Sequence, residues 1–259
     1  MKIENIETAP GHWLMAKMGK RVLRPGGVQL TNQLIDQLNI SVQDDVVEFA
    51  PGLGFTAALV RRKRPKSWTG IELDETAATR LRKKIGSTDH RIVQANASST
   101  GLQENSINRV YGEAMLTMQS EKRKAAIIQE AYRILKPGGY YGVHEIALSP
   151  DNLPEEKQSE IQKDLIESIK VNARPVTMKA WLKHFEDAGF EVVTRSTTPM
   201  HLLEPKRLIQ DEGILRVIKI RFNMMLHPKI AKRIRKIKAT FQKHSGYMNA
   251  FMAVVRKPQ

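Results

Sequence analysis

Apolar and polar positions follow two different spacings along residues 43–150, and the two spacings alternate. Short apolar runs predict strands, and longer stretches with helically spaced apolar positions follow most of them. The predicted strands are Val46–Phe49, Ser67–Leu73, Arg91–Ala95, Ile107–Gly112 and Tyr140–Ile146. The predicted helices are Thr56–Arg64, Glu75–Ile85 and Glu121–Leu135. Strands and helices that alternate in this way predict an α/β fold with a parallel sheet covered on both faces.

The segments that flank this core have a mainly helical pattern. Residues 1–42 predict N-terminal helices at 12–23 and 31–38, which the breaker Pro25–Gly27 separates. Residues 151–204 predict two lid helices and a late strand. These elements are expected at Asn152–Lys170, at Met178–Ala188 with Thr177 and Gly189 as caps, and at Phe190–Thr198. Residues 205–246 predict a basic helical insertion, and residues 247–259 predict the last strand.

Composition narrows the class of protein. The chain has 259 residues, of which 41% are hydrophobic and 27% are charged, as in ordinary globular proteins. It has no cysteine, which excludes disulfides, thiolate metal sites and a cysteine nucleophile. No apolar run approaches the ~20 residues of a membrane span. The first ten residues carry two acids and no apolar core, unlike a signal peptide. We therefore expect a cytoplasmic protein.

The net charge of +15 is concentrated near the C-terminus. Residues 205–259 hold fourteen Lys and Arg residues and two acids. Within them, the helix predicted over 229–241 carries an apolar stripe and a basic remainder. The stripe is Ile230, Ile234, Ile237 and Phe241, and the basic residues are Lys229, Lys232, Arg233, Arg235, Lys236 and Lys238. A packed helix with a solvated basic face, an anionic membrane surface and a nucleic acid all fit this pattern. Few aromatic residues interleave the charges, which favours a peripheral membrane contact over RNA.

The segment VVEFAPGLGFTAALV, from Val46 to Val60, places a carboxylate and two glycines between a strand and a helix. A glycine turn at this position lets a ligand approach bare backbone. Gly52 and Gly54 fit a dinucleotide fingerprint in which pyrophosphate binds the helix N-terminus. Glu48 argues against that interpretation, because a carboxylate beside the turn suits a ligand with an ammonium and a sulfonium.

Two later strand ends add to the predicted site. Glu72 ends the next strand about 20 residues after Gly52, where a carboxylate can accept both ribose hydroxyls. Asn96 and Ala97 follow the third strand, where they are placed to contact an adenine.

With these residues in register, the chain resembles the class I S-adenosylmethionine-dependent methyltransferases of the small-molecule type. The resemblance covers roughly 43–146. It implies one Rossmann-like methyltransferase domain over 1–259, with about seven strands, mostly parallel, and an antiparallel last strand. It implies S-adenosylmethionine as cofactor, bound by Glu48, Ala50, Gly52, Gly54, Glu72, Asn96 and Ala97. Ala50 departs from the usual glycine, and Asn96 departs from the commoner aspartate.

The acceptor is expected beyond the carboxyl ends of the fourth and fifth strands. His144 is the first candidate for the base, because its ordinary pKa lies near neutrality. Glu145 and Glu113 are the candidates for orienting a cationic amine. No clustered metal ligands are found, and no metal site is predicted. A Pro-Pro motif of the kind used on adenine amines is missing after the fourth strand.

These observations favour a small-molecule or lipid-like acceptor beneath lid helices. Two alternatives stay open: an RNA methyltransferase that uses the basic C-terminal region, and a non-catalytic or NAD-type Rossmann protein. The sequence predicts no oligomeric state.

Overall fold

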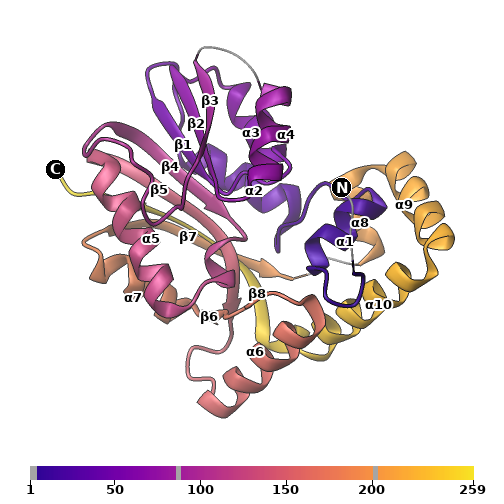
Figure 1. Ribbon diagram of the computed structural model, residues 1–259. Coiled ribbons are helices and arrows are strands. Elements are labelled where there is room, and N and C mark those ends of the chain that lie inside the picture. Colours follow the sequence, from indigo (N-terminus) through magenta and orange to yellow (C-terminus); the bar gives the residue numbers. More distant parts are fainter. Residues whose placement is uncertain (1–4, 86–88, 201–203) are drawn as a thin grey trace.

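The computed structural model describes residues 5–85, 89–200 and 204–259. They form a sheet with the strand order β3-β2-β1-β4-β5-β8-β7, and β6 pairs with the end of β5 (Figure 1). Strands β1 to β5 are parallel, and β8 runs antiparallel to both of its neighbours. The strands are β1 Asp45–Phe49, β2 Ser67–Glu72, β3 His90–Gln94, β4 Ile107–Glu113, β5 Leu135–Leu148, β6 Val176–Thr177, β7 Glu191–Pro199 and β8 Met248–Arg256. The predicted fold class, with its antiparallel last strand, is confirmed.

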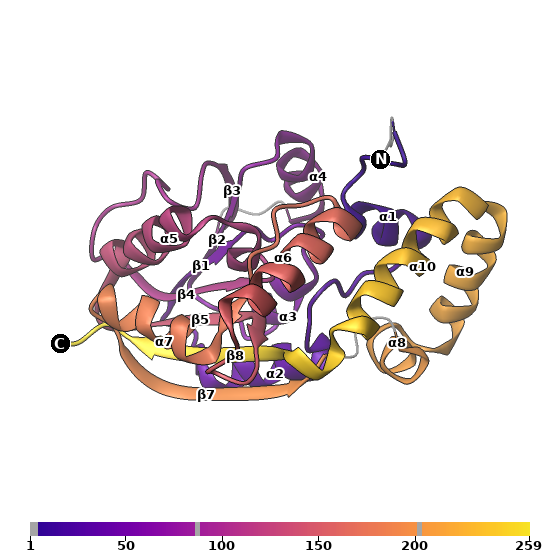
Figure 2. The ribbon, with the colours of Figure 1, turned by 90° about the horizontal axis from the view of Figure 1, so that it is seen from below.

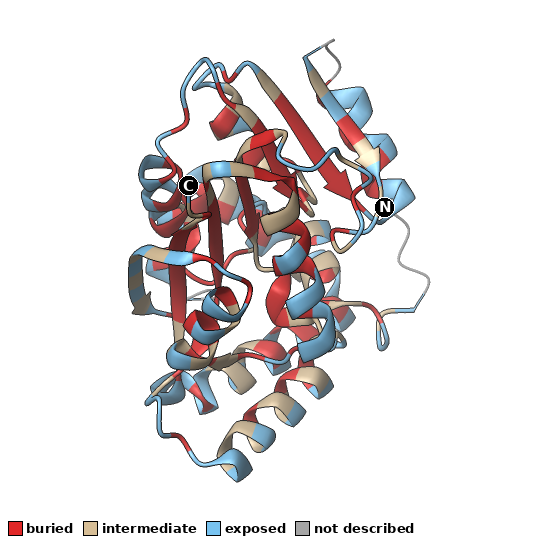
Figure 3. Cartoon of the chain, turned by 90° about the vertical axis from the view of Figure 1, so that its left-hand side faces the viewer, coloured by how far each residue is buried: buried red, intermediate tan, exposed pale blue. Residues whose placement is uncertain are grey.

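Helices cover both faces of the sheet, as Figure 3 shows by the buried strands between half-exposed helices. Apolar residues of α2, α3 and α4 pack on one face, and those of α5 and α7 pack on the other. The bounds are α2 Gly27–Gln37, α3 Phe55–Arg61, α4 Glu75–Ile85, α5 Glu121–Ile134 and α7 Met178–Asp187. The predicted cap of α7 is confirmed, because the Thr177 hydroxyl accepts a hydrogen bond from the Ala180 N–H at 3.2 Å. Gly189, just beyond α7, has a φ of 92°.

The other helices form a second layer beside the sheet (Figure 2). They are α1 Gly11–Met18, α6 Glu155–Ile169, α8 Pro205–Glu212, α9 Ile214–Leu226 and α10 Pro228–Lys243, and two short 3-10 turns lie at η1 Leu116–Met118 and η2 Ser245–Tyr247. Helix α10 contacts α1, α6 and α9. Its predicted apolar stripe is inward, since Ile230, Ile234 and Ile237 are buried. In the described part of the chain, no helix combines the length and the hydropathy required to cross a membrane.

Several predicted helix limits are wrong, for local reasons in one case and for tertiary reasons in another. Helix α1 ends at Met18 because Gly19, with a φ of 107°, turns the chain away. Helix α2 starts at Gly27 and not at residue 31, because the carboxylate of Asp211 on α8 accepts the Val28 N–H at 2.9 Å and caps the helix. Residues 1–4 of the predicted N-terminal segment lie outside the described residues. That all 259 residues form one domain stays a prediction.

Arg233 also departs from the expectation that it faces solvent with the other cations of the basic helix. It is buried, and its guanidinium donates to the carbonyls of Ser168 at 3.0 Å and Ala9 at 3.2 Å. Arg233 therefore joins α10 to α6 and to the segment before α1, because a buried guanidinium needs acceptors that replace water.

Candidate functional site

A cavity of about 290 Å³ lies at the carboxyl ends of β1, β2 and β4. Six of the ten predicted site residues line it, namely Ala50, Gly52, Glu72, Asn96, Ala97 and Glu113. The other four, Glu48, Gly54, His144 and Glu145, are not among its lining residues. Ligands of doubly wound sheets bind at this edge, so the cavity is the candidate ligand site.

The turn after β1 presents bare backbone to this cavity. Gly52 has a φ of 56°, and a Cβ built on it would have only the carbonyl oxygen of Ala50 within 4 Å, at 3.9 Å. Space for a ligand therefore lies directly against this glycine. Ala50 has a φ of 52°, a left-handed conformation that costs a residue with a Cβ about 1–2 kcal/mol.

Gly54 has a different place in the turn. It precedes α3 with a φ of 70°, and a Cβ there would lie 2.7 Å from Cδ2 of Leu81 on α4. The glycine allows α4 to pack closely against the turn. Its predicted part in the site is thus corrected to shaping the turn, without facing the cavity.

Glu72 connects the second strand end to the glycine turn. One carboxylate oxygen accepts the Gly52 N–H at 3.1 Å, and the other accepts the Asp74 N–H at 3.1 Å. A carboxylate offers about four acceptor positions, so two remain for a ligand. On the next loop, the Asn96 side-chain oxygen accepts the Ser98 N–H at 3.0 Å, and Ala97 forms part of the cavity wall.

Glu48 is not placed as the sequence predicted. Its carboxyl group is buried and accepts a hydrogen bond from the Tyr111 hydroxyl at 2.5 Å on the neighbouring strand β4. Burial raises the pKa of Glu48 to about 8, although the Tyr111 hydrogen bond and the Arg24 charge lower it. At neutral pH the group is therefore mostly protonated. Because Glu48 is buried against Tyr111 and does not line the cavity, the expectation that it faces a ligand ammonium is corrected to a hydrogen bond within the sheet.

Glu113 is the centre of a buried polar network at the cavity. Its carboxylate accepts hydrogen bonds from Thr31 at 2.6 Å and Thr56 at 2.5 Å, and Nε of Arg24 lies 2.6 Å from Oε2. Burial alone would raise the pKa of Glu113. The Arg24 charge and the hydrogen bonds from His144 and Thr31 outweigh it, and the pKa falls to about 2. Glu113 is therefore ionised, with both oxygens engaged by protein groups.

His144 is fully buried, and both of its ring nitrogens have partners. The Gly26 N–H donates to Nε2 at 2.9 Å, so Nδ1 carries the proton that faces Glu113 at 2.9 Å. An imidazole in this arrangement has no free nitrogen for an acceptor. The predicted role of His144 as general base is corrected to joining β5, Glu113 and the segment before α2.

Glu145 is also buried, and it is not among the residues that line the cavity. Its carboxylate accepts the backbone N–H groups of Met115, Leu116 and Thr117 at 2.8–3.0 Å and so caps η1. Burial raises the pKa of Glu145, and these hydrogen bonds oppose that rise. The predicted contact with a cationic amine is corrected to a structural cap.

Known proteins resemble this chain in sequence and in fold. A family model described as a methyltransferase domain matches residues 47–143, from β1 into β5. An uncharacterized protein of Haemophilus influenzae is 32% identical over 219 residues, which are 83% of this chain and 85% of that protein. The structure of the cyclopropane synthase MmaA2 from Mycobacterium tuberculosis aligns with a TM-score of 0.70 at 13% identity, over 97% of each chain.

A second solved structure of similar fold holds bound ligands. The phospholethanolamine N-methyltransferase 2 of Haemonchus contortus, solved with phosphomonomethylethanolamine and S-adenosylhomocysteine, has a TM-score of 0.71 at 14% identity. The alignment spans 96% of this chain and 57% of that chain. The chain belongs to the class I S-adenosylmethionine-dependent methyltransferases. It is accordingly an enzyme of that class.

The cavity of this methyltransferase is also lined by residues that the sequence analysis did not single out. His12 and Trp13 come from α1, and Arg21, Leu23 and Arg24 come from the segment that follows it. Burial lowers the pKa of His12 to about 4. No hydrogen bond to its ring is found within the described residues, in contrast to His144. Sequence carries no signal for these residues, because they reach the cavity only through the packing of α1 beside the sheet.

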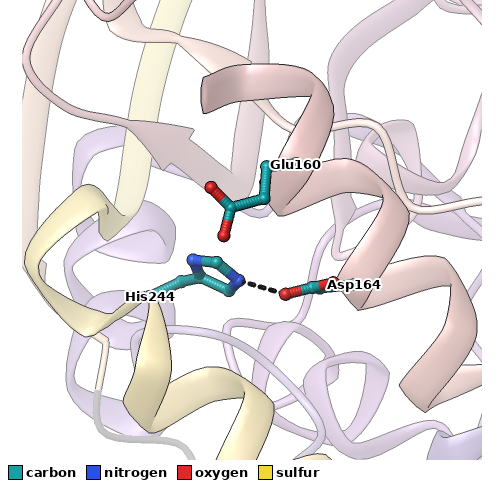
Figure 4. A group of neighbouring side chains, drawn as sticks. All are labelled: Glu160, Asp164 and His244. Carbon is teal, nitrogen blue, oxygen red and sulfur yellow. Dashed lines mark hydrogen bonds and ion pairs between the residues drawn. The ribbon is translucent and has the colours of Figure 1, made fainter. Parts of the chain in front are cut away.

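A cluster outside the cavity has atoms that could ligate a metal. Glu160 and Asp164 on α6 face His244 after α10, with one ligand atom of each within 4.8 Å of the others (Figure 4). Nζ of Lys243 lies 2.7 Å from Asp164 Oδ2 and 3.0 Å from Glu160 Oε1. Because an ammonium already compensates these carboxylates, we assign the cluster to an ion-pair network that joins α6 to α10 in this methyltransferase.

Proposed function

We propose that this methyltransferase binds S-adenosylmethionine in the cavity and transfers its methyl group to a small-molecule or lipid-like acceptor. When bound, S-adenosylmethionine supplies an electrophilic methyl group on a sulfonium, whose displacement depends mainly on alignment and desolvation. The observation that carries the proposal is the open space against Gly52 beside the carboxylate of Glu72. That combination fits a ligand with a narrow chain and a diol.

The chain's own residues divide the binding task. The turn at Ala50 and Gly52 offers backbone to the amino-acid part of the cofactor. Glu72 has two acceptor positions left for ribose hydroxyls, and a diol is a pair of donors. Ala97 and the side chain of Asn96 then form the wall for the adenine.

The cavity wall includes apolar side chains beside the charged Arg21, Arg24 and Arg123. Trp13, Leu23, Phe55, Met118 and Ile127 contribute to it. The apolar part of this lining excludes water from the nucleophile and favours an acceptor with apolar parts. This composition supports a small or lipid-like acceptor.

His12 is the group we assign to the acceptor. Its pKa of about 4 keeps the ring neutral at pH 7, and a base of that strength holds a proton weakly. It is suited to accept a hydrogen bond from the acceptor and so orient it. Glu113 has no acceptor position left for that task, because Thr31 and His144 face one of its carboxylate oxygens and Thr56 and Arg24 face the other.

Methyl transfer to separated pools tests this function. The protein is incubated with methyl-labelled S-adenosylmethionine and with a lipid extract, a small-molecule extract or total RNA from one cell source. We expect label in the lipid or small-molecule pool, and none with the Gly52→Val variant. Label found only in RNA would contradict the acceptor class, and label in no pool would contradict the activity.

A further inference from the structure

The outer surface of α9 exposes six large apolar side chains to solvent. Their exposed fractions run from 55% for Phe222 to 86% for Leu215. The six are Ile214, Leu215, Ile218, Phe222, Met225 and Leu226, and we call them the outer face of α9. At about 100° per residue, they all fall within an arc of about 120°. Exposed apolar residues that gather on one side of one helix mark an interaction surface.

This outer face is not needed for the packing of α9 itself. Val217 and Ile220 on the opposite side of the helix are buried, and Ile220 packs against apolar residues of α1 and α10. The side chain of Asn223 also donates to the carbonyl of Met18 at 2.9 Å. The helix is therefore anchored by one apolar side, and its second apolar side is left to another partner.

The charge around the outer face is positive. Lys219 and Arg221 are exposed and flank it, and Lys229, Lys232 and Arg235 are exposed on the adjoining α10. No ion pair with any of these five is found within the described residues. The two acids of residues 205–243 are buried and do not offset this charge at the surface. Asp211 caps α2, and Glu212 accepts the N–H groups of Arg21 and Val22. A partner that meets this surface must bring apolar groups and negative charge together.

We propose that the outer face of α9 inserts into the surface of an anionic lipid bilayer, with the flanking cations at the level of the lipid phosphates. An apolar helix face bordered by Lys and Arg is the pattern of helices that lie in the membrane interface. A second copy of the chain fits less well, because both copies would bring the same positive charge. The sequence placed the membrane contact at 229–241, whereas this proposal gives the insertion to α9 and leaves only charges to α10.

The position of α9 connects this surface to the cavity. Helix α9 packs on α1 through the side opposite to its outer face, and α1 supplies His12 and Trp13 to the cavity wall. Helix α1 is thus the structural link between the docking helix and the cavity. The docking itself does not depend on the proposed function, because it is measured without turnover.

Vesicle co-sedimentation of the full chain tests the proposal. The vesicles contain phosphatidylcholine alone or with phosphatidylglycerol, and each is used at low and high salt. We expect binding to the anionic vesicles that weakens with salt. The variant Leu215→Gln/Phe222→Gln/Met225→Gln should lose about tenfold or more in partition coefficient, since three inserted apolar groups are lost.

A matched control removes exposed apolar surface elsewhere. Val42 is 64% exposed and Val193 is 50% exposed, and Val42→Gln/Val193→Gln should bind like wild type. Thermal unfolding of each variant verifies that it folds. The proposal would be overturned if vesicle binding by the wild type did not depend on lipid charge, or if the triple variant bound vesicles as well as the wild type. Wild type that dimerises through this face and does not bind vesicles would assign the face to a second copy and overturn it as well.

Discussion

Glu113→Gln removes the negative charge that neutralises Arg24 beside the cavity. The two side chains are 2% and 10% exposed, and their atoms lie 2.6 Å apart. Breaking a buried pair by removing one partner costs about 3–5 kcal/mol, because the other charge stays buried. Arg24 keeps some solvent contact, so we expect about 3 kcal/mol of lost stability in urea unfolding at pH 7.

The pH dependence gives this prediction a second readout. The folded-state pKa of Glu113 is about 2, below its ordinary value of 4.5, so its stabilisation is present above that value. It is lost as the pH falls from about 5 to about 2, and the Gln variant should be less sensitive there. Glu191→Gln is the matched control. Glu191 also pairs with an arginine, Arg256, at 2.7 Å, but both side chains are about half exposed. That change should cost far less stability than Glu113→Gln, because solvent screens an exposed pair. Equal losses in the two variants would refute the buried-network argument.

Two further predictions concern the turn and the strand beneath it. Gly52→Val should abolish S-adenosylhomocysteine binding in calorimetry, because its side chain projects into the cavity. Gly101→Val has the same left-handed strain, with a φ of 72° and no neighbour within 4 Å, and should bind normally; equal binding by both variants would contradict the cavity assignment. Glu48 has a raised pKa of about 8, so wild type should lose stability as the pH rises from about 5 to 8. Glu48→Gln should remove that loss and be the more stable protein at pH 8 in urea unfolding, and an unchanged pH profile would show that the carboxyl is not buried in neutral form.

The fold, and the gathering of residues from several strand ends at one cavity, could be predicted because their determinants are local. A strand, a turn and a helix follow one another within about 20 residues, and the parallel order brings all carboxyl strand ends to one edge. Spacing could therefore bring Gly52, Glu72, Asn96 and Ala97 to this edge, and the resemblance to the methyltransferases added Ala50. The two-residue strand β6 was missed because it is too short to have a period.

The acceptor half depends on contacts between distant segments. The Gly26 N–H bonds to His144, which is 118 residues away, and that contact is what removes His144 from the list of bases. Three backbone N–H groups donate hydrogen bonds to Glu145, and no sequence motif predicts them. His12 comes to the cavity only because α1 packs on α9 and α10. The sequence does not distinguish Arg233 from its basic neighbours, because only the folded chain places backbone carbonyls around its guanidinium.

Calorimetric titration with S-adenosylhomocysteine and with NAD tests the central claim most directly. Wild type should bind S-adenosylhomocysteine and not NAD. Glu72→Gln should weaken that binding about tenfold or more, since a neutral amide makes weaker hydrogen bonds to a diol than a carboxylate does. Glu75→Gln, an exposed acid at the start of α4, should leave the affinity unchanged. Binding of NAD in place of S-adenosylhomocysteine, or an unchanged affinity in Glu72→Gln, would contradict the assignment of this cavity.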